Sequence, residues 1–363
     1  MSRVGIIGGG QLARMLGADA FRLGIETIAL DPSPRCPASA TCDIVVGELG
    51  DQEALGRLLD VSDVVTCELE HLPHATIDRL AGLESTRPNM NAVRICGDRL
   101  LEKRFVQGLG VETAPFHAVD DLKQAEDAAR AFAGPMVLKT RREGYDGKGQ
   151  AWVRTLADVE EAFASLGQRP CVAEGKVSFT RELSILGVRG LDGEVRTYPL
   201  VENVHEAGVL RLSLAPADVS EKLEVDAREI ATAILEALDY VGVLAIELFE
   251  TDKGLVVNEI APRVHNSGHW TIEGSATSQF ENHLRAVLGL PLGDTSTRGH
   301  SAMVNILGHA PPLDAMLRLP GARLHLYGKA PRENRKLGHI TISASDRAEL
   351  DKVVAQAMSL VAL

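Results

Sequence analysis

Two glutamates in apolar surroundings are the residues of this sequence best suited to chemistry. Glu247 and Glu259 each interrupt a run of β-branched and apolar residues, and a Thr-Asp-Lys-Gly turn at 251–254 separates the two runs. This pattern predicts a β-hairpin that brings both carboxylates to one point. Carboxylates in an apolar sheet are costly unless a cation lies between them, and Mg²⁺ shared with nucleotide phosphates meets that need. The alternative is an edge hairpin whose glutamates point to solvent.

The segment after the second run is dense in hydrogen-bond donors and proton carriers. It is Arg-Val-His-Asn-Ser-Gly-His at 263–269. Histidine ionises near neutral pH, so His265 is a candidate proton carrier, although it could also simply cap a loop through hydrogen bonds. We expect His269 and Trp270 to be structural, closing the turn into the next helix.

A glycine loop near the N-terminus matches a dinucleotide fingerprint. Gly8, Gly10 and Ala13 follow a predicted strand and open a helix, and Asp31 ends the next strand, where a ribose-binding acid would lie. Glycine amides and a helix N-terminus suit any phosphorylated ligand, so the match is weak evidence for NAD. We expect Asp31 to cap the Asp-Pro-Ser-Pro turn instead.

A second glycine loop, GYDGKGQ at 144–150, lies between two predicted strands and not before a helix. It is therefore neither a Rossmann turn nor a Walker loop. Such a loop can fold over a triphosphate as a flap, with amides on phosphate oxygens and Lys148 supplying charge. Lys139 ends a buried strand, where a lysine is expected to meet an anion. The alternative for the loop is a flexible hairpin tip.

The elements that must position these residues change in character along the chain. Strands expected at 3–7, 26–30, 43–46 and 63–67 alternate with helices at 11–23, 51–60 and 74–82, which predicts a doubly wound parallel sheet. A small unit follows, with helices at 97–109, 119–132 and 156–166 and strands at 135–140, 151–153 and 171–177. The last part has antiparallel strands at 183–189, 194–201 and 209–212, helices at 218–239 and 275–288, and a tail of short strands and a final helix.

Composition bounds the class of protein. The chain has 363 residues, 45% hydrophobic and 24% charged, as in soluble globular enzymes with two or three domains. A net charge of −12 argues against a nucleic-acid partner. The five cysteines form no C-x-x-C pair and are expected to be buried thiols in a reducing compartment. With no apolar run long enough for a membrane span and no signal peptide, we expect a cytoplasmic protein.

The motifs together resemble the ATP-grasp enzymes and, more narrowly, the N5-carboxyaminoimidazole ribonucleotide synthetase family of purine biosynthesis. The resemblance covers essentially the whole chain. It is carried by GGGQL at 8–12, the flap loop, APRVHNSGHWT at 261–271, TSQFENHLRAV at 277–287 and YGKAPRENRKLGH at 327–339. It implies the reaction of ATP, bicarbonate and 5-aminoimidazole ribonucleotide to ADP, phosphate and N5-carboxyaminoimidazole ribonucleotide.

The resemblance also implies an α/β fold, α+β overall, of three domains. Residues 1–97 would form a Rossmann-like domain with a parallel sheet, and residues 98–178 a linker helix and a small lid that carries the flap loop. Residues 179–363 would form the C-terminal ATP-grasp domain, an antiparallel sheet with the magnesium site and a segment for the substrate phosphate. A homodimer is implied, with the helix at 275–288 or the first domain as a candidate contact.

Site residues follow from the resemblance by position. Glu247 and Glu259 would bind Mg²⁺, for which Mn²⁺ could substitute. The expected ATP-binding residues are Arg99, Lys139, Gly144, Tyr145, Asp146, Gly147, Lys148, Gly149, Gln150, Glu174, Val177, Glu182, His205, Asn258 and Glu259. The expected ribonucleotide-binding residues are Gln11, Leu12, Glu70, Tyr145, Asp146, His265, Asn266, Lys329, Arg335 and Lys336. Lys329 and the Arg335-Lys336 pair lie in an expected polar loop, where a solvated basic face is the alternative.

The catalytic residues implied are Asp146, His265, Arg263 and Lys329. Asp146 is the candidate to accept or orient the amine proton, and His265 the candidate to pass a proton to phosphate or to bind carboxyphosphate. Three other functions compete with this assignment. A formate-dependent glycinamide ribonucleotide transformylase shares the architecture, an NAD-dependent dehydrogenase would explain only the first glycine loop, and a nucleotide sensor would bind ATP without turnover.

Overall fold

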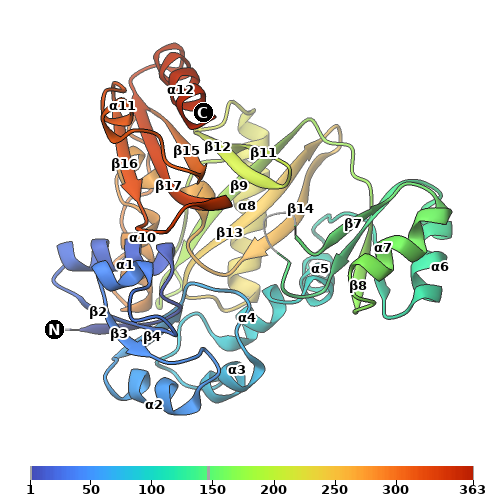
Figure 1. The fold of residues 1–363 in the computed structure, drawn as a ribbon, viewed down its shortest axis with the longest axis horizontal. Helices are drawn as coiled ribbons and strands as arrows, with labels where there is room; N and C mark the ends of the chain where they lie inside the picture. The colour runs from blue at the N-terminus through green and yellow to red at the C-terminus, as the bar shows by residue number, and fades with distance from the viewer. Residues whose placement is uncertain (1, 145–147, 363) are drawn as a thin grey trace.

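The computed structural model describes residues 2–144 and 148–362, which form three β-sheets. The first sheet has four parallel strands in the order β3-β2-β1-β4 and carries the N-terminus (Figure 1). The predicted parallel sheet is thus confirmed. Its elements are β1 (Arg3–Ile7), α1 (Gln11–Arg22), β2 (Glu26–Asp31), η1 (Pro37–Ala40), β3 (Asp43–Val46), α2 (Gln52–Asp60), β4 (Val64–Cys67) and α3 (His74–Leu80).

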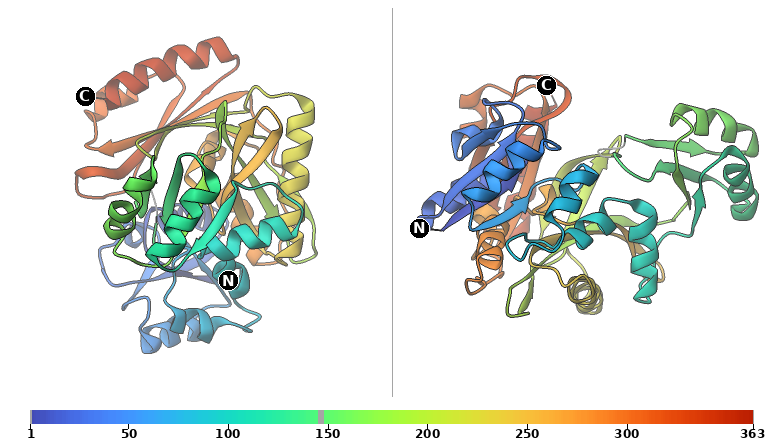
Figure 2. Two further views of the ribbon diagram at one scale, coloured as in Figure 1. Left: turned by 90° about the vertical axis from the view of Figure 1, so that its right-hand side faces the viewer. Right: turned by 90° about the horizontal axis from the view of Figure 1, so that it is seen from below.

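A linker of two helices, α4 (Met90–Cys96) and α5 (Arg99–Gly108), leads to a second, smaller lobe. The sequence pattern did not predict α4 and placed the start of α5 two residues too early. Helix α5 starts at Arg99 because the Asp98 carboxylate accepts from the N–H groups of Leu100 and Leu101. The lobe is an antiparallel sheet in the order β5-β8-β6-β7 that projects from the body (Figure 2). Its elements are β5 (Phe116–Val119), α6 (Leu122–Phe132), β6 (Met136–Thr140), β7 (Gln150–Val153), η2 (Leu156–Asp158), α7 (Val159–Ser165) and β8 (Cys171–Gly175).

Strand alternation explains how this smaller lobe presents one face to a ligand. Met136 and Leu138 of β6 are buried against the helices α6 and α7, whereas Val137 and Lys139 lie on the opposite face and line a cleft. The loop between β6 and β7 is the predicted strand-loop-strand. Tyr145, Asp146 and Gly147 of this loop lie outside the described residues.

The third and largest sheet has nine strands. Its neighbours are antiparallel, in the order β14-β13-β9-β11-β12-β15-β17-β16, with β10 beside β9. Its strands are β9 (Arg181–Arg189), β10 (Val195–Thr197), β11 (Val201–Glu206), β12 (Val209–Ala215), β13 (Gly242–Thr251), β14 (Gly254–Ala261), β15 (His300–Gly308), β16 (Ala322–Leu326) and β17 (Arg332–Ala344). The accompanying helices are α8 (Glu221–Ala237), η3 (Asn266–Gly268), α9 (Thr271–Gly274), α10 (Gln279–Val287), α11 (Leu313–Leu317) and α12 (Arg347–Val361).

Both faces of this sheet are covered at β13. Leu244 and Ile246 pack with α8 in one hydrophobic cluster, while Val243 and Ala245 pack with α10 and α1 in another. A strand buried on both faces is continuously apolar, which is the pattern seen in the sequence. Glu247 is therefore a charged exception in an otherwise apolar stretch of β13.

The predicted hairpin is present as β13 and β14. Glu247 pairs with Glu259 in register, and a β-bulge follows between Glu247 and Leu248. Because directly opposed residues of antiparallel strands point to the same face, both carboxylates emerge on one side of the sheet. The structure confirms the convergence expected from the sequence.

Two expectations for the C-terminal part are wrong. Arg335 and Lys336 lie in β17, a strand of 13 residues, and not in a polar loop. The helix expected from residue 275 begins at Gln279, because the Ser278 side chain caps it by accepting from the Glu281 N–H. All residues of this helix α10 except Arg285 are buried within the chain, which leaves α10 little surface for the dimer contact expected there.

The cysteines behave as expected, since all five are free and buried. Burial raises the pKa of Cys67 to about 12 and that of Cys171 to about 11, so these thiols are poor nucleophiles. In the two described stretches, 2–144 and 148–362, we find no helix long and apolar enough to cross a membrane.

His283 of α10 joins the first lobe to the large sheet. Its Nδ1 accepts from the Val243 N–H over 3.1 Å, so its Nε2–H faces Thr66 Oγ1 of β4 at 2.8 Å. Complete burial lowers the pKa of His283 to about 4, against 6.5 for an exposed histidine. Below pH 6.5 the unfolded chain takes up a proton that the folded protein excludes, so this contribution to stability is full above pH 6.5 and is lost as the pH falls toward 4.

We expect the variant His283→Asn to be less stable than the wild type at pH 7.5 but to lose less stability on acidification. The wild-type loss assigned to His283 is about 3 kcal/mol between pH 6.5 and 4. Urea unfolding at a series of pH values measures it, with the exposed His117→Asn as the control. An unchanged pH dependence in the His283 variant would contradict the assignment.

Candidate active site

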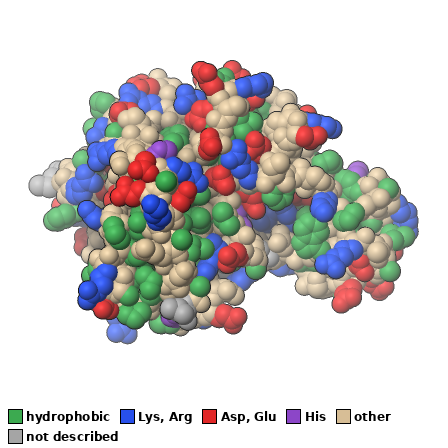
Figure 3. Space-filling view, turned by 90° about the horizontal axis from the view of Figure 1, so that it is seen from above, with side chains coloured by type: hydrophobic (Ala, Val, Ile, Leu, Met, Phe, Trp, Pro, Cys, Tyr) green, Lys and Arg blue, Asp and Glu red, His purple; other side chains and the backbone are tan. Residues whose placement is uncertain are grey.

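A cleft of about 1470 Å³ lies where the three sheets meet. Figure 3 shows the recess between the body and the smaller lobe, with Lys and Arg side chains at its edge. The candidate residues that line it are Gln11, Leu12, Glu70, Arg99, Lys139, Gly144, Lys148, Gln150, Glu174, Val177, Glu182, His205, Glu247, Asn258, Glu259, Arg263, His265, Asn266, Lys329, Arg335 and Lys336. Gly149 is described but does not line the cleft; its carbonyl instead accepts from the Thr140 N–H over 2.8 Å.

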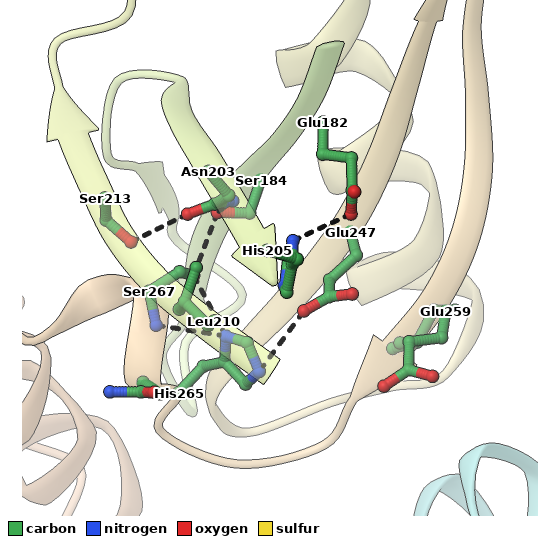
Figure 4. A network of polar contacts seen from close by, with 12 residues as sticks. Glu182, Ser184, Asn203, His205, Leu210, Ser213, Glu247, Glu259, His265 and Ser267 are labelled. Atoms are coloured by element: carbon green, nitrogen blue, oxygen red, sulfur yellow. Dashed lines mark hydrogen bonds and ion pairs between the residues drawn. The ribbon is translucent and has the colours of Figure 1, made fainter. Parts of the chain in front are cut away.

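The paired glutamates form an acidic centre in this cleft (Figure 4). Burial, together with the charge of Glu259, raises the pKa of Glu247 to about 7. Behind them, Glu102 is buried with its Oε2 accepting from the Ile260 N–H over 2.8 Å, and burial and Glu259 raise its pKa to about 8. The centre therefore has an excess of negative charge, which a divalent cation would relieve.

A positively charged centre lies on the side of the cleft formed by the smaller lobe, called the lid from here on. Lys139 Nζ is 2.9 Å from one oxygen of the buried Glu174 carboxylate, and Lys103 Nζ of α5 is 3.2 Å from the other. Although burial opposes ionisation, the two lysines lower the pKa of Glu174. Glu174 thus holds two lysines with one carboxylate, which leaves this wall of the cleft with net positive charge.

Arg99 connects the base of the flap loop to the acidic centre. Its guanidinium donates to the carbonyls of Thr140 over 3.0 Å and Gly144 over 3.2 Å, and it lies 3.8 Å from Glu259 Oε2. A Cβ on Gly144 would come within 2.5 Å of Arg99 Nη1 and 3.0 Å of the Lys148 carbonyl oxygen, so a larger residue here would displace the Arg99 guanidinium. Glycine at the start of the flap loop thus permits the contact between Arg99 and the loop.

On the large sheet, His205 of β11 and Glu182 of β9 form an ion pair of 2.8 Å beside Glu247 (Figure 4). Burial acts against protonation, but the hydrogen bond to Glu182 and the charge of Glu247 raise the pKa of His205. His265 also lies beside Glu247, with Nε2 at 3.6 Å from Oε1. Burial, Arg263 and Lys336 lower the pKa of His265 well below its ordinary range.

The face toward the first lobe contains several pairs between distant elements. Arg263 forms a bidentate ion pair with Glu70, in which Nη2 donates to Oε1 over 3.1 Å. Although burial opposes ionisation, Arg263 lowers the pKa of Glu70 to about 2. Lys329 Nζ donates to the Gln11 side chain. Asn266 exchanges two amide hydrogen bonds with Asn305, over 2.7 and 3.1 Å.

Glu68 is the most important site residue that sequence analysis missed. Its buried carboxylate follows β4 and accepts from the Gly10 and Ala13 N–H groups at the N-terminus of α1. Burial raises its pKa to about 7. A Cβ on Gly10 would lie 2.5 Å from Glu68 Oε1, so the loop needs glycine there to admit this side chain.

Glu68 overturns the dinucleotide interpretation of the first glycine loop, because a carboxylate already occupies the amides that would bind a pyrophosphate. Asp31 accepts from the N–H groups of Ser33 over 2.8 Å and Gly9 over 3.1 Å, which is the capping role expected. The available signal for Glu68 was its position at the end of the fourth strand of a parallel sheet. Lys103 could have been found four residues after Arg99 on the same helix face.

Comparison with known proteins identifies the class to which this fold and cleft belong. Residues 1–97 match a ribonucleotide synthetase preATP-grasp domain, residues 104–280 an ATP-grasp domain, and residues 301–353 a phosphoribosylaminoimidazole carboxylase C-terminal domain. The chain is therefore an ATP-grasp ligase.

Relatives over the full length narrow this class. An N5-carboxyaminoimidazole ribonucleotide synthase from Pseudomonas aeruginosa is 48% identical over 99% of both chains. The crystal structure of the synthetase from Thermus thermophilus has a TM-score of 0.95 and 51% identity, covering 99% of each chain. That of the Aspergillus clavatus synthase in complex with ADP and 5-aminoimidazole ribonucleotide has a TM-score of 0.92 and 34% identity, covering 99% of this chain and 98% of that one. The chain belongs to the N5-carboxyaminoimidazole ribonucleotide synthase family of purine biosynthesis.

Removal of the Glu68 carboxylate is expected to turn the N-terminus of α1 into an anion site. We expect Glu68→Ala to melt at a lower temperature than the wild type and to be stabilised by phosphate by roughly 3 °C more than the wild type is. Thermal melts in phosphate and in chloride of equal ionic strength measure this difference. Glu53→Ala, which changes an exposed glutamate of α2, is the control. Equal phosphate effects in all three proteins would show that these amides do not form an anion site.

Proposed function

We propose that this protein carboxylates 5-aminoimidazole ribonucleotide on its exocyclic amine, consuming ATP and bicarbonate. The observation that carries the proposal is the acidic pair Glu247 and Glu259 facing the lysines of the lid across one cleft. That arrangement suits a triphosphate, whose negative charge would meet the lysines on one side and the glutamates, through Mg²⁺, on the other. The Aspergillus clavatus relative, solved with ADP and the same ribonucleotide, supports the choice of substrates.

The nucleotide would lie against the lid. Lys139, Lys148 and Arg99 would neutralise its phosphates, and the loop with Gly144, Gly147, Gly149 and Gln150 would close over them. Since the Glu174 carboxylate is committed to two lysines, we assign to Glu174 the positioning of those lysines at the nucleotide. Val177 would contact the adenine, and Glu182 with His205 would bind the ribose.

The residues present fit a magnesium ion shared with the nucleotide. In the described part of the chain no three His, Cys, Asp or Glu side chains gather as a complete ligand set, so phosphate oxygens and water must complete the coordination. Glu247 and Glu259 would hold Mg²⁺, with Asn258 beside them, and Mn²⁺ has compatible chemistry. Bound there, the ion would supply charge neutralisation at the transferring phosphoryl group.

The ribonucleotide would lie toward the first lobe. Lys329, Arg335 and Lys336 form the cationic side of this region and would bind its phosphate. Gln11, Leu12 and Glu70 would seat the sugar and base, and Asn266 and Tyr145 would complete the contacts. Arg263 would keep Glu70 oriented through their ion pair.

The reaction would proceed in two steps. Bicarbonate oxygen attacks the γ-phosphorus of ATP, ADP leaves, and carboxyphosphate forms. Carboxyphosphate then releases CO₂ and phosphate, and the amine attacks CO₂ and loses a proton. Asp146 would accept that proton, His265 and Arg263 would bind the reacting anion, and Lys329 would stabilise it. Closure of the flap would exclude the water that destroys carboxyphosphate.

The domain division at residues 97 and 178 and the homodimer are further parts of the proposal. The three sheets support the division. Because α10 is buried, the first lobe is the remaining candidate for the dimer contact named from the sequence. Light scattering of the purified protein tests the dimer directly.

The decisive experiment is ADP release from Mg-ATP and bicarbonate, with and without 5-aminoimidazole ribonucleotide. We expect strong stimulation by this nucleotide and none by glycinamide ribonucleotide with formate. Stimulation only by the second pair would assign the protein to the formate-using branch. Stimulation by neither would leave a nucleotide-binding protein without this activity.

Glu259→Gln is expected to lower kcat by at least ~10³-fold while the fold persists, because the cation that neutralises the phosphates loses a charged ligand. Glu250→Gln, a change in the same hairpin outside the cleft, should keep kcat within ~3-fold. Circular dichroism checks the fold, and Mg²⁺ titration of nucleotide binding checks the metal site. Full activity of Glu259→Gln would refute the magnesium assignment.

A further inference from the structure

A chain of buried polar side chains leads from the interior of the large sheet to His265 (Figure 4). Ser213 Oγ–H donates to Asn203 Oδ1 over 2.7 Å, and Asn203 Nδ2–H donates to Ser184 Oγ over 2.8 Å. Ser184 Oγ–H donates to Ser267 Oγ over 2.8 Å, and Ser267 Oγ lies 2.9 Å from His265 Nδ1. The chain crosses β12, β11 and β9 and ends at the active-site histidine.

This chain has no direct access to substrate. Ser184 and Ser213 are 0% exposed, Ser267 1% and Asn203 5%, and all four lie beneath the residues that line the cleft. Apolar side chains of similar size would fill such positions without the cost of desolvating polar groups. Any functional effect of these hydrogen-bonded side chains must therefore act at the end of the chain, on the His265 ring.

The direction of donation is fixed by a backbone group. The Ser267 N–H, which can only donate, points to His265 Nδ1 over 3.3 Å. Nδ1 is therefore an unprotonated acceptor, so the ring carries its proton on Nε2. The Asn203 amide hydrogens donate into Ser184, so each hydroxyl donates onward toward the ring. Every link of the chain agrees with this tautomer.

We propose that Ser267, Ser184 and Asn203 are positioning residues that hold His265 with its Nε2–H directed into the cleft beside Glu247. The Nε2 atom lies 3.6 Å from Glu247 Oε1, in the space between the acidic pair and the ribonucleotide side. An Nε2–H there donates a hydrogen bond to an anionic oxygen. The opposite tautomer would present a lone pair to the same anion and repel it.

This inference rests on the proposed function, in which bicarbonate, carboxyphosphate and phosphate occupy that space in turn. The His265 Nε2–H would bind an oxygen of each of them without itself transferring a proton. An oriented donor of this kind lowers the barrier because it needs no reorganisation when the charge develops. The serines and Asn203 act only through the ring.

The tautomer can be measured without any turnover. Long-range ¹H–¹⁵N correlation spectra of protein labelled with ¹⁵N-histidine distinguish a protonated from an unprotonated ring nitrogen, and the spectrum of His265→Asn assigns the signals. We expect His265 to be neutral with the proton on Nε2. A proton on Nδ1, or on both nitrogens, would overturn the inference even if the ligase activity is present.

The positioning role can be measured in the kinetics. We expect Ser267→Ala to lower kcat ~10-fold and Ser184→Ala ~3-fold, each with the KM for ATP within ~2-fold of the wild type, because the lost interaction acts on the reacting anion. Ser275→Ala is the matched control. Its hydroxyl is also buried, 2% exposed, and donates to the Ser296 carbonyl over 3.1 Å outside the cleft.

The control separates positioning from a general loss of stability. Ser275→Ala should lower the melting temperature as the other two variants do but leave kcat within ~2-fold. Equal kcat values in Ser267→Ala and Ser275→Ala, or a change in the KM for ATP in place of kcat, would overturn the inference. If Ser267→Ala does not fold, Ser184→Ala and the wild-type spectrum provide the test.

Discussion

The repulsion between Glu247 and Glu259 is the interaction on which the rest of the site depends. Antiparallel pairing places the two carboxylates opposite each other, and burial raises the pKa of Glu247 to about 7. A sheet that holds like charges together is stable only if positive charge arrives from elsewhere. Arg99 of α5 lies 3.8 Å from Glu259, and the nucleotide with its metal ion would supply the remainder. The hairpin therefore carries an electrostatic cost that a bound cation would relieve.

Neutralisation of carboxylates by cationic side chains from other elements also connects the three lobes. Glu174 of β8 is neutralised by Lys139 of the lid and Lys103 of the linker helix, and Glu70 of the first lobe by Arg263. The Lys103–Glu174 pair is buried, the other two pairs are partly buried, and each pair joins different elements. Breaking one would leave a buried charge without a partner, which costs more than the pair contributes. The residues that are proposed to bind ligands thus also hold the lobes in place around the cleft.

The hydrogen bonds of other buried polar groups have a different task. Glu68 closes the N-terminus of α1 and so removes an anion site that would compete with the intended one. The chain from Asn203 to Ser267 orients a single ring proton at His265. In the proposed function, the charged pairs would determine where the anionic substrates bind. The hydrogen bonds of Glu68 and of the chain to His265 would determine which donors and acceptors face the substrates.

The sequence by itself determined the hairpin, the parallel sheet and the strand-loop-strand of the flap, because side-chain periodicity and glycine positions are local properties. Most candidate site residues also followed from its motifs, and all of those described except Gly149 line the cleft. Only the tertiary structure decided that Glu68 occupies the glycine-loop amides, that Glu174 joins two lysines, that Arg335 and Lys336 belong to a strand, and that α10 is internal. Each of these depends on contacts between residues far apart in the chain. Local patterns carry no information about which distant partner will satisfy a buried charge or amide.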